Sequence, residues 1–117
     1  MKLSPIVLVA ALLFSSVLFA DDQDPEIDYL LKSIGKSECV FIRNGSRHSA
    51  EKAEEHLRMK YERGRRYATS AEAFIERLAS KSSMTRKLYM MDCPGEEAKP
   101  SGEWLTRRLE EFRQGQE

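Results

Sequence analysis

The chain has 117 residues, with 19 lysines and arginines balanced by 19 aspartates and glutamates, so its formal net charge at pH 7 is zero. A chain without a basic excess lacks the electrostatic attraction of a general nucleic-acid binder, and we expect no nucleic-acid partner. A chain of this length has room for a single small domain with a modest hydrophobic core.

The first 20 residues have the features of a secretory signal peptide. Met1 and Lys2 are followed by an uncharged, mostly apolar run from Leu3 to Ala20. A basic start, a short apolar stretch and a small residue at the cut are typical of a cleaved export signal. An uncleaved membrane anchor would need a longer apolar span of about 20 residues. We therefore expect residues 1–20 to be a signal peptide, residues 21–117 to be one domain without a stable membrane span, and the protein to be secreted, into the periplasm.

The first helix of the mature domain is expected to begin at Pro25. Asp24 is suited to the N-cap and Pro25 to the first helical position. Gly35 is typical of the residue that ends a helix. Between them, four apolar residues follow the i, i+3, i+4, i+7 spacing of a helix with one buried face: Ile27, Leu30, Leu31 and Ile34.

A β-hairpin is expected next. The segment Cys39–Ile42 contains β-branched and aromatic residues, which favour strands. The Asn44-Gly45 pair that follows is the strongest sequence pattern for a two-residue type I′ turn, because both central positions of that turn require a positive φ. Such a turn sets a register in which Phe41 pairs with His48, so these two side chains should share one face of the sheet.

The rest of the chain alternates between helical patterns and short strands. The expected elements are a helix opened at Ser49 and ended at Gly64, a helix with the capping box Thr69–Glu72, a polar loop Ser80–Thr85, a strand Leu88–Asp92, a loop Glu96–Gly102 and a final helix around Trp104. The predicted fold class is therefore α+β, with a small antiparallel sheet, made of the Asn-Gly hairpin plus one later strand, packed with about four helices.

Cys39 and Cys93 are the only cysteines of the chain. One opens the first predicted strand and the other follows the last. Antiparallel pairing of these strands would bring the two thiols together, whereas parallel pairing would separate them. Export to an oxidising compartment favours a structural disulfide, and the alternative is two half-buried free thiols. A redox role is not expected without a Cys-x-x-Cys spacing.

His48 and His56 are the residues most suited to chemistry, but their spacing does not specify any. They lie eight positions apart with a turn-to-helix junction between them, so they cannot chelate a metal side by side as histidines at i and i+4 do. A hydrolase would need one of them within hydrogen-bond reach of a hydroxyl such as that of Ser82 or Ser83. No nucleophile-elbow pattern is present. We therefore expect no metal site, no cofactor and no catalytic residue, and we interpret both histidines as structural.

A dense basic segment overlaps the second helix, and five cations lie in it: Arg58, Lys60, Arg63, Arg65 and Arg66. Two interpretations are open. In one, the segment is a solvated helix end at which the helix macrodipole stabilises the cations. In the other, it is a surface for an anionic partner such as lipid phosphate or an acidic glycan. The candidate functional surface is the hairpin with the adjacent helix, namely Arg43, Asn44, Gly45, His48, His56, Arg58 and Lys60.

Several motifs also resemble the YfeK-like family of small secreted bacterial proteins. They are Phe41–His48, Ala53, His56–Lys60, Thr69–Ile75, Ala79–Ser83, Thr85, Tyr89 and Trp104-Leu105. The family pattern, however, has Gly and Pro where Arg86 and Leu88 stand here, which implies that neither residue is essential to a site. The family's function is not established, so the resemblance implies location and fold but no activity.

These observations favour a non-enzymatic envelope protein that binds or stabilises a partner through the surface around the hairpin. The alternative is a small hydrolase-like enzyme that uses His48 or His56 with Ser82 or Ser83. An enzyme would show a concave site that joins a histidine to a hydroxyl or a carboxylate. A binding module would show a grooved or flat patch instead.

Overall fold

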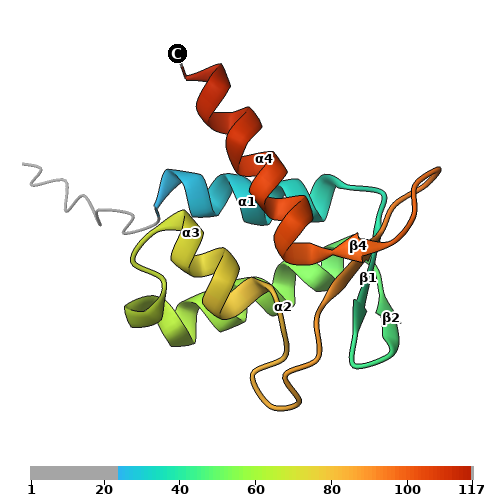
Figure 1. The fold of residues 1–117 in the computed structure, drawn as a ribbon. Helices are drawn as coiled ribbons and strands as arrows, with labels where there is room; N and C mark the ends of the chain where they lie inside the picture. Colours follow the sequence, from blue (N-terminus) through green and yellow to red (C-terminus); the bar gives the residue numbers. More distant parts are fainter. Residues whose placement is uncertain (1–23, 117) are drawn as a thin grey trace, which may run out of the picture.

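A computed structural model describes residues 24–116 (Figure 1). The expected signal peptide, residues 1–20, lies outside the described residues. Within them, no helix is both long enough and apolar enough to cross a membrane.

Helix α1 (Pro25–Lys36) begins as its sequence predicts. The Asp24 carboxylate accepts hydrogen bonds from the backbone amides of Glu26, at 2.8 Å, and Ile27, at 3.4 Å. The prediction that Gly35 ends the helix is wrong, because the helix continues to Lys36. The space beside this glycine is occupied by another residue: a Cβ at Gly35 would collide with the carboxylate end of the Glu54 side chain.

The sheet has four antiparallel strands in the order β2-β1-β3-β4. The strands are β1 (Val40–Arg43), β2 (Ser46–His48), β3 (Met90–Asp92) and β4 (Lys99–Pro100). The hairpin register is confirmed, with Phe41 opposite His48, and Asn44 and Gly45 have φ angles of 51° and 80°. Strand β4 lies in a segment that the sequence predicts to be a loop. Its pattern is weak because it has only two residues and one of them is a proline, which strands accept only at an edge.

The helices that follow the hairpin match their sequence patterns to different extents. Helix α2 (Ala50–Gly64) is capped by Ser49 as expected and runs into a 3-10 turn, Arg65–Tyr67. The next helix is capped by Ser70 rather than by Thr69, so α3 spans only Ala71–Phe74 before a π-helical stretch, Ile75–Ala79. Helix α4 (Ser101–Gly115) begins inside the expected loop. The third strand begins at Met90, and Leu88 forms an isolated bridge with Lys81.

One hydrophobic core joins the helices to one face of the sheet. Phe41 and Met91 lie opposite each other in neighbouring strands and are both buried on this face. Helix α2 packs on β1 and α4 packs on β3, while α1 contacts both of these helices (Figure 1). The apolar residues that predicted the α1 face are all buried, as are those that follow Ser70: Ala71, Phe74, Ile75, Leu78 and Ala79. The α+β prediction is therefore confirmed.

Cys39 and Cys93 form a disulfide, with their Cα atoms 4.0 Å apart. The register of the central strand pair explains the contact. Val40 is opposite Asp92. Cys39, which precedes Val40, therefore lies opposite Cys93, which follows Asp92. Antiparallel pairing, one of the two arrangements left open by the sequence, brings the sulfurs together.

Arg86 is the second non-glycine residue with a positive φ in the described chain, at 66°. Side chains rarely adopt this conformation, because their Cβ crowds the following carbonyl. We expect Arg86→Gly to raise the free energy of unfolding by about 1 kcal/mol, since glycine removes the strain. Urea denaturation measures the change. The matched variant Lys87→Gly should show no gain, and equal gains in both variants would contradict the explanation.

Candidate functional site

A groove of about 280 Å³ lies between the β1–β2 hairpin and helix α2. We call it the hairpin groove. It is lined by Phe41, Arg43, His48, Lys52, Ala53, Glu55, His56 and Met59. Two features of the local sequence produce it. The period of two places Phe41, Arg43 and His48 on the same face of the hairpin, and the helical period places the α2 residues opposite them.

The structure brings most of the candidate residues together. Arg43 and His48 from the hairpin face His56 from α2, and Lys60 follows one turn further along the helix. His48 is half-buried beside Phe41, as its register predicts. Its ring lines the groove.

Three of the remaining candidates lie outside the groove. Asn44 and Gly45 form the exposed hairpin turn, and the hydroxyl of Thr85 donates a hydrogen bond to Asn44 Oδ1 at 2.5 Å. Arg58 faces α1: it pairs with Asp28 at 3.3 Å and Glu54 at 2.7 Å. Because two carboxylates already bind its guanidinium, Arg58 belongs to the α1–α2 interface.

Tyr89, which the sequence indicated only through the family resemblance, is the centre of the polar contacts beside the groove. Lys60 Nζ donates hydrogen bonds to the Tyr89 hydroxyl, at 3.0 Å, and to the carbonyl oxygen of Lys81, at 3.2 Å. His56 Nε2 lies 3.4 Å from the same hydroxyl. The tyrosine ring is buried against Phe41, with 5.0 Å between the ring centroids. Since Lys60 donates to the hydroxyl, the tyrosine proton is free to point toward His56.

Burial and mutual repulsion shift the pKa values of this cluster. Desolvation, followed by the charge of Arg43, lowers the pKa of Lys60 from 10.5 to about 8. Desolvation also lowers the pKa of His56 to about 4, with smaller contributions from Arg43, Lys60 and His48. Burial raises the pKa of Tyr89. At neutral pH, His56 and Tyr89 are therefore neutral and Lys60 is mostly charged.

Two cations at the groove and its edge have no counter-ion among the residues that the structure describes. Within residues 24–116, no carboxylate pairs with Arg43 or Lys60. The acidic residue of the groove, Glu55, lies 3.6 Å from the ammonium of Lys52. The result is a partly buried concentration of positive charge, which attracts anions.

The two serines of the hydrolase alternative lie in the loop that precedes β3. Ser82 is buried, and its hydroxyl oxygen accepts hydrogen bonds from the backbone amides of Met84 and Thr85. Ser83 is exposed. In the part of the chain that the structure describes, no hydrogen bond joins either serine to His48 or His56, and no group of three or more potential metal ligands is found.

Comparisons with known proteins agree with the motifs of the sequence. The model of a family of unknown function, DUF5329, matches residues 21–113. The chain is also similar to the uncharacterized protein YfeK of Salmonella typhimurium (strain LT2), with 35% identity over 88 residues, which cover 72% of this chain and 73% of the relative. No solved structure matches significantly. The resemblance to the YfeK-like family is confirmed.

Proposed function

The chain belongs to the DUF5329 family of unknown function, and from this premise we propose that it is a non-enzymatic envelope protein that binds an anionic partner through the hairpin groove. One observation carries the proposal. Arg43 and Lys60 are close enough for the first to lower the pKa of the second, and neither has a carboxylate partner in the described chain. A bound anion would supply the missing negative charge.

The groove offers an anion several kinds of contact. A guanidinium can donate two parallel hydrogen bonds to a carboxylate, phosphate or sulfate, and an ammonium adds a second positive charge. The arriving negative charge would raise the pKa of His56 and so favour its protonation, which adds a third donor. None of these steps breaks a bond in the partner. The arrangement suits binding rather than hydrolysis.

The envelope location is supported by two features. Residues 1–20 have the pattern of an export signal, and the Cys39–Cys93 disulfide is of a kind that persists in oxidising compartments. Cell fractionation with mass spectrometry of the N-terminus tests this location. The expected product is a periplasmic chain that begins at Asp21. A full-length chain in the cytoplasm would exclude the envelope role.

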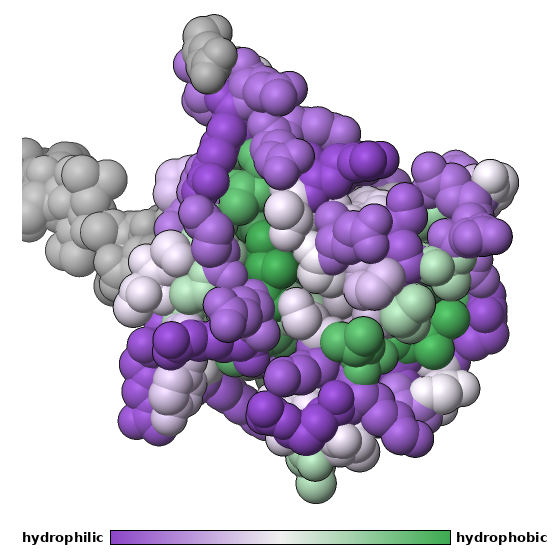
Figure 2. Space-filling model, in the orientation of Figure 1, coloured by the Kyte–Doolittle hydropathy of each residue, from purple (hydrophilic) through white to green (hydrophobic). Residues whose placement is uncertain are grey.

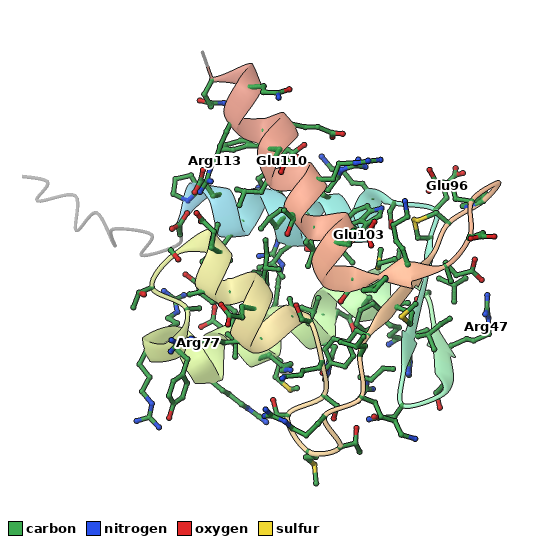
Figure 3. All side chains as sticks on the ribbon, viewed as in Figure 1. Arg47, Arg77, Glu96, Glu103, Glu110 and Arg113 are labelled. Atoms are coloured by element: carbon green, nitrogen blue, oxygen red, sulfur yellow. A yellow bond between two sulfur atoms is a disulfide. The ribbon has the colours of Figure 1, made fainter. Side chains whose placement is uncertain are left out.

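The binding site is tested by titrating the purified protein with sulfate, whose charge is constant near neutral pH, and following backbone amide shifts by NMR. We expect Arg43→Gln to weaken binding about tenfold, because a charge-assisted hydrogen bond is lost. The matched control is Arg47→Gln. Arg47 lies on the same hairpin but on the opposite face, where it pairs with Asp92 at 2.7 Å, and it points away from the helices (Figure 3).

Sulfate affinity should be almost unchanged in Arg47→Gln, although both variants remove one positive charge. The amides that shift should be those of the hairpin and of α2. If the two variants lost affinity equally, the attraction would come from general charge, and a specific groove would be excluded. If sulfate shifted no groove amide, the proposal would fail outright.

A further inference from the structure

The loop between the π-helix and β3, residues 81–88, projects from the body of the protein (Figure 1). We call it the tip loop. Lys81 and Leu88 form an antiparallel bridge at its base. The backbone amide of Ser82 donates to Lys87 O at 2.9 Å, and that of Arg86 donates to Ser82 O at 3.0 Å. These contacts give the loop a defined shape.

The tip loop holds an apolar side chain out in water. Met84 is 93% exposed, and its backbone amide is held by the hydroxyl of Ser82. Leu88, at the base, is 54% exposed. Two other large apolar residues, Met59 and Tyr67, are exposed to a smaller extent. In the space-filling view, a hydrophobic knob protrudes at the end of this loop from a mostly hydrophilic surface (Figure 2).

The segment that contains this apolar tip carries positive charge and no negative charge. No acidic residue occurs between Glu76 and Asp92, an interval that contains Arg77, Lys81, Arg86 and Lys87. In the described chain, none of these four cations is in an ion pair. Their charges are therefore available to a partner.

The tip loop and the hairpin groove form one continuous surface. The Thr85 hydroxyl donates a hydrogen bond to the side chain of Asn44 in the hairpin turn, and Lys60, beside the groove, donates one to the carbonyl oxygen of Lys81. In Figure 1 the tip loop and the hairpin turn project from the same side of the molecule. A partner that engages the tip loop can reach the groove at the same time.

We infer that this surface docks on an anionic phospholipid bilayer, with Met84 inserted at the interface and the cations of the tip loop among the lipid headgroups. The inference rests on the proposed function and names its partner class. Charge complementarity favours it, because acidic headgroups match the tip loop, where residues 81–88 include three cations and no acid. The exposed methionine distinguishes a bilayer from a soluble anion, since only the bilayer gives an isolated apolar side chain a place to be buried.

Vesicle co-sedimentation tests the inference. The purified protein should bind vesicles of phosphatidylglycerol mixed with phosphatidylcholine, not vesicles of phosphatidylcholine alone, and added salt should weaken the binding. We expect Met84→Ser and Lys87→Gln each to reduce the affinity about fivefold. The control is Arg107→Gln, which removes an exposed charge from α4 and should leave the affinity almost unchanged.

A second measurement reports insertion directly. In Met84→Trp, the added indole should shift its emission to shorter wavelength on phosphatidylglycerol vesicles, while the native Trp104 is already buried in the protein. Absence of binding to anionic vesicles would overturn the inference, as would unchanged affinity in Met84→Ser. In either case Arg43-dependent sulfate binding would leave the proposed function standing. Vesicle binding without sulfate binding that depends on Arg43 would refute the proposal that the hairpin groove binds anions, and with it the inference as stated.

Discussion

Loss of the Cys39–Cys93 disulfide should lower the free energy of unfolding by about 4 kcal/mol. The two cysteines are 54 positions apart, so the bridge restricts a large part of the unfolded chain. It also joins the ends of β1 and β3 at the centre of the sheet. Small domains are stable by only about 5–15 kcal/mol in total, so the reduced protein should be marginal.

The double variant Cys39→Ala/Cys93→Ala measures this loss by urea denaturation, with the wild type in reductant as a second form of the same experiment. Intact-mass analysis after alkylation checks that the untreated wild type has no free thiol. A loss below about 1 kcal/mol would contradict the prediction, because it would mean that the strand pairing restrains the chain without the bridge. Each single variant leaves one free thiol and is a less direct comparison.

Lys60→Met should weaken sulfate binding about 10-fold to 100-fold while stabilising the protein by about 1 kcal/mol. The binding loss follows because a charge-assisted hydrogen bond is worth about 1.5–3 kcal/mol. The gain in stability follows because folding removes water from the Lys60 ammonium without providing a counter-ion. That gain is small, since the side chain is only half-buried and solvent screens its charge.

The pH dependence of stability and of sulfate affinity identifies Lys60 as the cause of both effects. Its pKa is about 8 in the folded protein and 10.5 ordinarily, so between these values the unfolded chain binds one proton more. Wild-type stability should therefore rise with pH over this window, and Lys60→Met should lack that rise. Sulfate affinity should change in the opposite direction, falling about tenfold from pH 7 to pH 9 as folded Lys60 loses its proton.

Sulfate titrations and urea denaturation at pH 7, 8 and 9 check both trends in wild type and Lys60→Met. The control is Lys32→Met, which removes an exposed ammonium paired with Asp28 on α1. Lys32→Met should keep the wild-type affinity and its fall with pH. A wild-type affinity that stayed constant across this range would show that Lys60 does not contact the anion.

Local hydrogen bonds and apolar spacing determined the parts of this protein that could be predicted from sequence. The N-caps at Asp24 and Ser49 were correct because each depends on amides within three residues. The register of Phe41 and His48 was correct because the Asn-Gly turn sets it over a few residues. The buried face of α1 followed from its spacing alone.

Tertiary packing decided what those local patterns could not. Strand β4 exists because β3 offers it an edge, and the π-helix lies under the start of α4, where the buried Ser101 hydroxyl donates to Ala79 O at 2.6 Å. The meeting of His56, Lys60 and Tyr89 depends on residues 29 to 33 positions apart in the chain. Such a contact forms only when a helix and a strand pack together, and its shifted pKa values arise from the burial that packing creates. The sequence by itself therefore specified the hairpin, the main helices and their apolar faces, whereas the fold decided the edge strand β4, the π-helix and which polar groups meet.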